Sequence, residues 1–132
     1  MKKIEYFVSE HSDFEKQFDH FVWKKRFKAL PKQIMELREP LLSGDFPGTL
    51  IKKSDTPTPY EVYKLRLPNP DANAGKSNGY RIVYIVVTER KIVVFLAIYY
   101  KKEGVVSDAY IDGLVQGVLL DTIPYEDDTS ET

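Results

Sequence analysis

Two basic residues in segment 60–67 are spaced so that they can hold one phosphate group. The segment reads YEVYKLRL, and its alternation of residue types predicts a strand. In a strand, Lys64 and Arg66 point to the same face and lie about two residue rises apart. Two neighbouring cations repel each other unless an anion lies between them, and a phosphate satisfies both. An exposed edge strand that uses positive charge to discourage edge pairing explains the same spacing equally well.

A third cation, Arg81, opens the next predicted strand, residues 80–87. It shares a face with Val83 and Ile85 and therefore stands at the end of an apolar row. An arginine in such a place reaches over the sheet edge or pairs with an acid, and pairing is the ordinary structural expectation. The preceding string AGKSNG adds the donor Lys76 and two glycines that let a ligand approach the backbone. This string is not a P-loop, since both the spacing and the following helix are missing.

Aromatic and basic side chains meet at the end of the following strand. The string AIYYKKE places Tyr99 and Tyr100 directly before Lys101 and Lys102. An aromatic face can stack on an unpaired base, at ~1–3 kcal/mol per base, while a neighbouring cation holds the phosphate. Tyrosines at strand ends are also often half-buried with their hydroxyls in water. The pattern favours a single-stranded nucleic acid as the ligand.

The histidines and carboxylates do not fit the common ribonuclease mechanisms. His11 and His20 lie in the predicted N-terminal helix region, away from the basic residues in sequence, and Glu61 and Glu103 are not spaced as metal ligands. The remaining route uses the 2′-hydroxyl of RNA as the nucleophile, with lysines and arginines stabilising the anionic phosphorane and a desolvated lysine moving a proton. Such a reaction leaves a 2′,3′-cyclic phosphate and requires no cofactor or metal ion.

The hydrophobic pattern predicts the elements that position these residues. We expect the order strand, helix, helix, strand, strand, strand, helix, with the first strand at residues 4–8 and a last helix at 107–120 despite Gly113 and Gly117. Ser12 and Glu15 predict a capping box at the start of the first helix, and Pro31 suits the first turn of the second. Residues 43–59 are expected to be an irregular connection. The strands at 60–67 and 80–87 should be antiparallel neighbours, and the strand IVVFLAIYY should be central or well covered.

Charge is distributed unevenly along the chain. The 132 residues carry 19 basic and 20 acidic side chains, a net charge of −1, yet residues 1–120 hold all 19 basic residues and 15 of the acids, a net of +4. A basic body with an acidic tail suits a nucleic-acid binder, although solvated surface lysines give the same composition. We expect a single domain at residues 1–123 and a disordered acidic tail at 124–132.

The composition also indicates in which compartment the protein resides. The chain has no cysteine, which excludes disulfides and thiolate chemistry. No apolar run approaches the ~18 residues of a membrane span, and the basic N-terminus is not followed by the apolar region of a signal peptide. We therefore expect a cytoplasmic protein that does not contact a membrane.

The strings YKLRL, GKSNGYRIVY and AIYYKKE, in this order, resemble the RelE and HigB toxins of bacterial type II toxin–antitoxin systems. The resemblance covers most of residues 1–112. It implies an α+β fold, in which a small antiparallel sheet has two N-terminal helices packed on it. It also implies an mRNA endoribonuclease that acts on translating ribosomes, inhibits translation and is neutralised by a cognate antitoxin protein, without a cofactor or metal ion.

The same resemblance assigns roles to individual residues. It implies a catalytic cluster of Lys64, Arg66, Arg81 and Lys102, and RNA binding by Lys76, Tyr99 and Lys101. Members of the family have a tyrosine shortly after the last basic position, whereas Tyr110 comes about two residues later than this pattern, so the parts of Tyr110 and Tyr100 stay open. ParE toxins, which share the fold but bind DNA gyrase, and a degenerate toxin kept as a binding module are the alternative functions.

Overall fold

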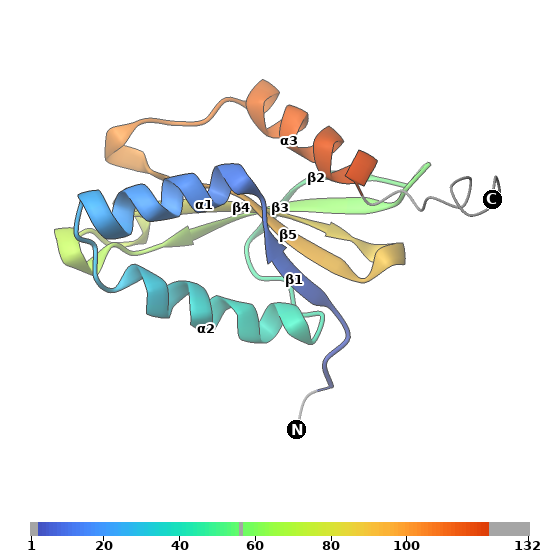
Figure 1. Cartoon of the computed structure of the whole chain (residues 1–132), viewed down its shortest axis with the longest axis horizontal. Helices are drawn as coiled ribbons and strands as arrows, with labels where there is room; N and C mark the ends of the chain where they lie inside the picture. Colours follow the sequence, from blue (N-terminus) through green and yellow to red (C-terminus); the bar gives the residue numbers. More distant parts are fainter. Residues whose placement is uncertain (1–2, 56, 122–132) are drawn as a thin grey trace, which may run out of the picture.

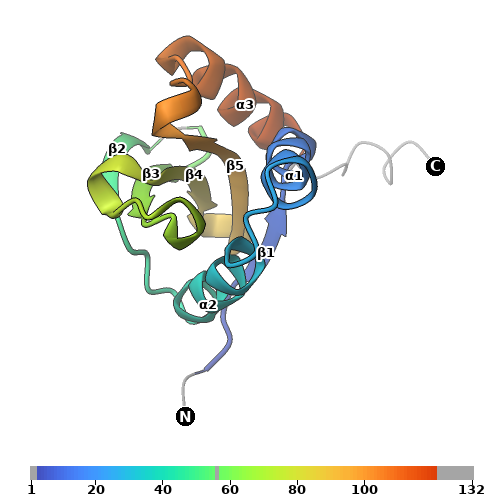
Figure 2. The same cartoon turned by 90° about the vertical axis from the view of Figure 1, so that its left-hand side faces the viewer.

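A curved five-stranded sheet forms the centre of the protein, in a computed structural model that describes residues 3–55 and 57–121. The strand order is β1-β5-β4-β3-β2. Figures 1 and 2 show α1 and α2 against one face of the sheet and α3 against the other. The predicted α+β class and the two N-terminal helices packed on the sheet are therefore confirmed. The elements are β1 (Phe7–Glu10), α1 (Ser12–Asp19), α2 (Leu30–Leu42), β2 (Thr49–Ser54), β3 (Tyr60–Leu67), β4 (Tyr80–Val87), β5 (Ile92–Tyr100) and α3 (Asp108–Asp121).

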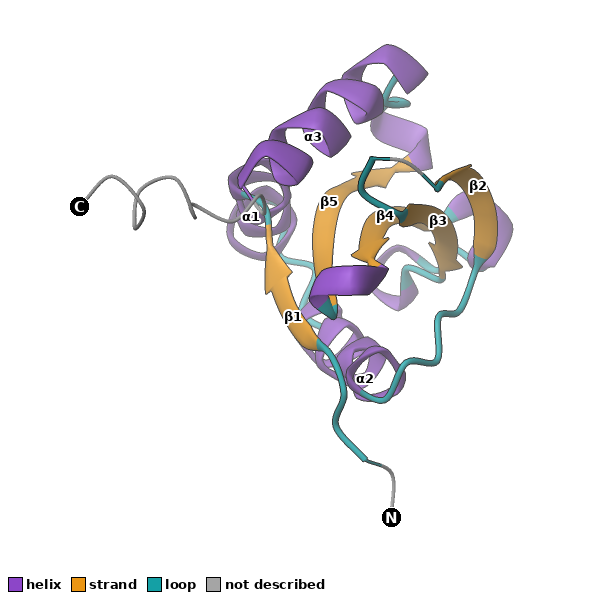
Figure 3. Ribbon diagram, turned by 90° about the vertical axis from the view of Figure 1, so that its right-hand side faces the viewer, coloured by secondary structure: helices purple, strands orange, loops and turns teal. Residues whose placement is uncertain are grey.

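The sheet is antiparallel from β2 to β5, but β1 lies parallel to β5. Figure 3 shows β1 at one edge of the sheet and β2 at the other. The prediction of an antiparallel sheet is thus wrong for this one strand. A hairpin forces its two strands to be antiparallel, and β3, β4 and β5 are joined in that way. β1 is not joined to β5 by a hairpin, so the connection does not fix its direction and packing sets it.

Two strand predictions need correction. The segment 43–59, expected to be irregular, contains β2, which pairs with β3 and has a register shift between Leu50 and Lys52. β2 is an edge strand with mostly exposed or half-buried residues, so it lacks the apolar alternation by which strands are recognised. The first strand occupies Phe7–Glu10 rather than residues 4–8.

The first helix begins one residue earlier than a capping box at Ser12 requires. Its N-cap is His11, whose Nδ1 accepts a hydrogen bond from the backbone N–H of Asp13 at 3.0 Å. Ser12 is already helical, so the predicted capping role of Ser12 and Glu15 is wrong. Phe14 of this helix and Phe21 of the segment that follows it are buried in the core. In α2, Pro31 lies in the first turn, as expected.

A β-bulge in β5 allows this central strand to serve two cores. Val83 pairs with Ala97 and Tyr84 pairs with Phe95, so Leu96 has no partner in β4. The extra residue places Leu96 and Ala97 together on the face that packs on α3, whereas Phe95 packs on the side of α1 and α2. The sequence prediction of a well-covered strand that is apolar on both faces is confirmed, because β5 lies between β1 and β4 and both of its faces are buried.

The last helix covers the second face of the sheet. Ile111, Leu114, Val115 and Val118 of α3 are buried against β3, β4 and β5. The helix forms over Asp108–Asp121, close to the predicted range. Among residues 3–55 and 57–121, no helix has both the length and the apolar composition of a membrane span.

The loop between β3 and β4 folds tightly against the end of β3. A Cβ on Gly79 would lie 2.1 Å from the carbonyl oxygen of Leu67 and 2.9 Å from that of Gly75, whereas a Cβ on Gly75 would meet nothing within 4 Å. Only glycine therefore allows the loop to approach the strand at residue 79.

We expect Gly79→Ala to lower the free energy of unfolding by about 1–3 kcal/mol, because the loop must move away from β3 to make room for the methyl group. Urea denaturation measures this change. Gly75→Ala is the matched control and should change the free energy of unfolding by less than about 0.5 kcal/mol. Equal effects of the two substitutions would contradict the close approach at Gly79.

Candidate functional site

A row of polar side chains crosses three strands at one end of the sheet. We call Arg66, Arg81 and Tyr99 the basic row. Arg66 in β3 pairs directly with Arg81 in β4, and Arg81 pairs with Tyr99 in β5. Residues directly opposite in an antiparallel pair share a face and have Cβ atoms about 5 Å apart. This face is the one that packs on α3 further along the same strands. The pairing thus brings together three residues that the sequence singled out separately.

Lys64 lies one row further along β3, on the same face. It pairs with Val83 on one side and with Thr49 of β2 on the other. Its side chain is half-buried, whereas Arg66 is exposed. The predicted placement of Lys64 and Arg66 on one face is confirmed, since Tyr60 and Val62 of the same alternation pack against α3. An anion that lies over this end of the sheet can meet both cations.

Arg81 holds the loop between β3 and β4. Its side chain is only 7% exposed, and its guanidinium donates hydrogen bonds to the carbonyl oxygens of Lys76 (2.9 Å), Ser77 (3.0 Å) and Tyr80 (3.3 Å). Like charges directly opposite each other destabilise a sheet. The carbonyl dipoles offset this repulsion because they solvate the guanidinium of Arg81, and Arg66 faces solvent. The sequence allowed Arg81 to reach over the sheet edge or to pair with an acid, and the partners in the structure are backbone carbonyls.

The 3₁₀ turn Lys101–Glu103 at the end of β5 is attached to the same loop. The backbone N–H of Lys101 donates to the carbonyl oxygen of Gly79 at 3.2 Å, and its Nζ donates to that of Ser77 at 3.3 Å. Lys76 is exposed on the loop, and Lys102 is exposed on the turn. Lys102 lies in this turn, outside the paired strands that carry Lys64, Arg66 and Arg81.

The two tyrosines at the end of β5 point to opposite faces. Tyr99 is half-buried beside Arg81 on the site face. Tyr100 is buried on the other face, where its ring packs edge-on against Phe27 at 5.7 Å between centroids and lies 5.8 Å from the ring of Tyr80. Tyr99 can therefore offer a ring to a ligand, whereas Tyr100 belongs to the core.

Sequence reasoning missed an ion-pair cluster that borders the site. Glu103 lies 2.8 Å from Nζ of Lys25 and 3.4 Å from Nε2 of His20, both from the segment that follows α1. Burial raises the pKa of Glu103, but the hydrogen bonds and charges of Lys25 and His20 outweigh burial and hold this pKa below its usual value. His20 is far from Glu103 in sequence, and only the packing of α1 along β5 brings them together.

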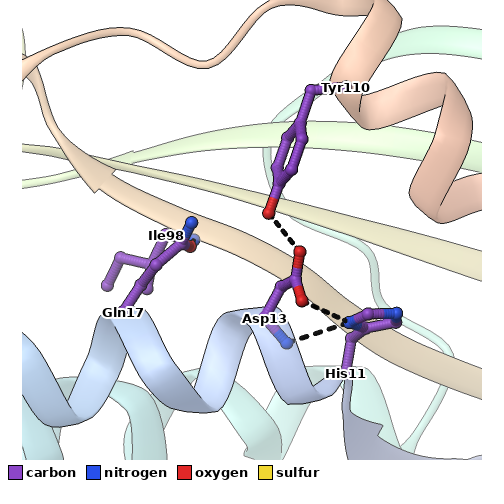
Figure 4. Close-up of polar contacts among 5 residues, drawn as sticks. All are labelled: His11, Asp13, Gln17, Ile98 and Tyr110. Atoms are coloured by element: carbon purple, nitrogen blue, oxygen red, sulfur yellow. Dashed lines mark hydrogen bonds and ion pairs between the residues drawn. The ribbon is translucent and has the colours of Figure 1, made fainter.

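A second polar cluster ties α3 to α1 (Figure 4). The hydroxyl of Tyr110 donates to the carboxylate of Asp13, and His11 caps the same helix end. Gln17 accepts a hydrogen bond of 2.8 Å from the backbone N–H of Ile98, beyond the point where β1 stops pairing with β5. Burial, followed by the interaction with Asp13, raises the pKa of Tyr110 to about 12. Tyr110 thus has a structural partner outside the basic row.

Residues 3–55 and 57–121 contain no group of three or more His, Cys, Asp or Glu side chains that could hold a metal ion.

Comparisons with known proteins identify the fold. No protein-family model matches the chain, and no curated protein matches it in sequence. Among solved structures, the chain is similar to a chain of the archaeal RelE–RelB complex from Pyrococcus horikoshii OT3, with a TM-score of 0.51 and 20% identity over 76% of this chain and 100% of that chain. The protein therefore has a RelE-like fold.

Weaker likenesses are found to two structures of E. coli RelE. The isolated toxin gives a TM-score of 0.45 at 22% identity, over 84% of this chain and 97% of that chain. A mutant toxin in complex with a RelB antitoxin peptide gives 0.40 at 21% identity, over 83% of this chain and 95% of that chain.

We expect Arg81→Ala to loosen the loop at residues 75–79, because three carbonyl oxygens lose a charged donor. The loss in the free energy of unfolding should be about 1–3 kcal/mol. Hydrogen exchange should accelerate at the amides of Asn78 and Lys101, which bond to carbonyls of this loop. Arg66→Ala is the matched control, since Arg66 is exposed, and it should leave these amides protected. Unchanged protection in Arg81→Ala would contradict the role of Arg81 in holding the loop.

The tie between α3 and α1 makes stability depend on pH at alkaline values. The folded state keeps Tyr110 protonated up to a pKa of about 12, whereas the unfolded chain loses this proton near pH ~10. The contribution of Tyr110 is therefore complete below about pH 10 and is lost as the pH rises toward 12. Tyr110→Phe should make the decline in the free energy of unfolding less steep in this window.

Tyr63→Phe is the control for the alkaline experiment. Burial and Glu61 also raise the pKa of Tyr63 to about 12, but Tyr63 lies on the sheet face away from α3. Both substitutions should flatten the pH profile, and only Tyr110→Phe should accelerate hydrogen exchange in α3. A profile of Tyr110→Phe identical to that of the wild type would show that the bond to Asp13 does not stabilise the fold.

Proposed function

We propose that this protein is an mRNA endoribonuclease of the RelE type and the toxin of a toxin–antitoxin pair. The observation that supports the proposal most is the position of Lys64, Arg66 and Arg81 on neighbouring strands of a RelE-like fold, on one face and at the end of the sheet where Tyr99 offers an aromatic ring. Cations beside an aromatic ring are the combination that binds single-stranded RNA.

In the proposed reaction, the 2′-hydroxyl oxygen of RNA attacks the adjacent phosphorus atom and the bond from phosphorus to the 5′-oxygen breaks. The products are a 2′,3′-cyclic phosphate and a 5′-hydroxyl, and no metal ion or cofactor takes part. Lys64 and Arg66 hold the scissile phosphate and stabilise the charge of the phosphorane. Arg81 adds positive charge from the neighbouring strand, and a guanidinium has five donors, more than its three described hydrogen bonds use.

The remaining residues bind RNA or move a proton. Tyr99 stacks on a base, and Lys76 and Lys101 hold the backbone from the loop and the turn that flank it. Lys102, exposed in the same turn, gives a proton to the leaving 5′-oxygen, and water takes the proton that the attacking 2′-hydroxyl loses. Translating ribosomes supply positioning, because a site that has no tuned general base gains most from a substrate held in the reactive geometry.

Regulation by an antitoxin follows from the same surface. We propose an acidic, partly disordered antitoxin that covers the face of Lys64, Arg66 and Arg81 or distorts the C-terminal segment. The domain boundary at residue 123 and the acidic tail at residues 124–132 fall outside the described residues. From the sequence, we also propose that the acidic tail binds weakly to the basic face of its own chain and competes with RNA there.

A direct test incubates the full chain with translating ribosomes and maps the 5′ ends of the mRNA. Endoribonuclease activity produces new ends inside coding sequences and 2′,3′-cyclic phosphates on the upstream fragments. Gyrase inhibition without mRNA cleavage would instead identify a ParE-like toxin, for which cations in register on adjacent strands have no evident use. If neither activity appears and RNA is bound, the protein is a binding module and the enzymatic proposal is wrong.

We expect Lys64→Ala and Arg66→Ala each to slow mRNA cleavage by about 10- to 1,000-fold, because each removes one donor from the developing charge. The double variant should lose less than the product of the two factors, since both cations act on one phosphate. Cleavage rates in the ribosome assay give these factors. Arg90→Ala, in the exposed hairpin between β4 and β5, is the control and should cleave at the wild-type rate. Multiplicative losses would indicate two independent surface charges.

A further inference from the structure

A cavity of about 400 Å³ adjoins the basic row on the side of β2. Lys64 lines it, so the cavity opens beside a cation that we place at the scissile phosphate. Ile51 of β2, Val62 of β3 and Ile111 of α3 supply apolar wall. Its volume lies in the range of small-ligand pockets, ~300–1,000 Å³. A flat apolar group attached to a phosphate on Lys64 therefore has a place to bind.

The polar wall of the cavity contains a cation and two carboxylates. Nζ of Lys52 in β2 lies 2.9 Å from Oδ1 of Asp112 in α3, and Asp108 comes from the preceding turn of the same helix. Among the described residues, this bond to Lys52 is the one polar contact of the Asp112 carboxylate. Its second oxygen remains available as an acceptor, because a carboxylate has about four acceptor positions.

This wall is unsuitable for a second phosphate and suitable for a base. Asp108 and Asp112 would repel an anion at close range. An ammonium beside a carboxylate instead offers a donor next to acceptors. Among the four RNA bases, only guanine has a Watson–Crick edge with one acceptor, O6, beside two adjacent N–H donors, N1 and N2. Adenine, cytosine and uracil can each satisfy fewer of these groups.

We propose that this cavity is a guanine-binding subsite for a nucleotide next to the scissile phosphate. Asp112 accepts hydrogen bonds from N1–H and N2–H, Lys52 donates to O6, and Ile51 and Ile111 contact the faces of the base. The subsite rests on the proposed ribonuclease function and adds a base preference to it. It also explains why carboxylates stand beside a surface that otherwise attracts RNA.

The first experiment maps cleavage sites on mRNA in the ribosome assay. The wild type should cut next to guanine more often than the base composition of the message predicts, and Asp112→Asn should reduce this preference about five- to tenfold, the lower part of what a bidentate base contact contributes. The rate summed over all sites should fall less than the guanine preference. Glu89→Gln, which removes an exposed carboxylate in the hairpin between β4 and β5, is the control and should keep the preference.

A charge exchange separates base recognition from a merely structural ion pair. The double variant Lys52→Asp/Asp112→Lys restores an ion pair between β2 and α3 but reverses its donor and acceptor. If the pair only anchors α3, the exchange should restore both the wild-type melting temperature and the wild-type cleavage pattern. If the pair recognises guanine, the exchange should restore the melting temperature and leave the guanine preference lost.

Binding of mononucleotides to the full chain provides a readout that requires no cleavage. Titration followed by NMR should show tighter binding of guanosine monophosphate than of inosine monophosphate, which lacks the N2 amino group, or of adenosine monophosphate. Asp112→Asn should remove the difference. Cleavage without any preference for guanine, together with equal binding of the three nucleotides, would overturn the subsite while the proposed ribonuclease stands. Guanosine-selective binding without cleavage would reject the ribonuclease and retain the pocket.

Discussion

The register between β3 and β4 is the constraint on which the candidate site depends. It places Arg66 directly opposite Arg81, so that the Cβ atoms of two arginines lie about 5 Å apart on one face. The repulsion is relieved because Arg81 turns to the carbonyl oxygens of the loop that precedes its own strand. These hydrogen bonds hold the loop between β3 and β4 in place. The same loop accepts two hydrogen bonds from Lys101, which attaches it to the 3₁₀ turn after β5. Arg66 remains exposed and available to a ligand.

α3 covers the other half of the sheet face that carries Arg66 and Arg81. Its apolar residues cover the sheet, and polar contacts attach its first turns on both sides, through Tyr110 to α1 and through Asp112 to β2. The helix therefore ends the apolar core next to Lys64 and brings two carboxylates to the border of the basic row. The same packing that stabilises the helix also shapes the cavity beside the proposed phosphate site.

Much of the architecture was predictable because local patterns carry it. The alternation of YEVYKLRL predicted the face of Lys64 and Arg66, and the turn-rich loop predicted the antiparallel pairing of β3 with β4. β2 was missed because an exposed edge strand needs no apolar alternation, and the direction of β1 was missed because no hairpin joins it to β5. The histidine cap at the start of α1 was missed because Ser12 matches the commoner capping motif.

The sequence by itself determined which residues share a face, since alternation in a strand is a property of the backbone. It therefore placed Lys64 and Arg66 on one face, whereas the register of the strands added Arg81 and Tyr99 to that face. Only the tertiary structure decided what each side chain does with its charge or ring. Arg81 binds backbone carbonyls, Tyr100 enters the core, and Asp112 meets Lys52 across the sheet edge. Such contacts join residues that are distant in the chain, and their distances are set by how helices and strands pack, which no local pattern encodes.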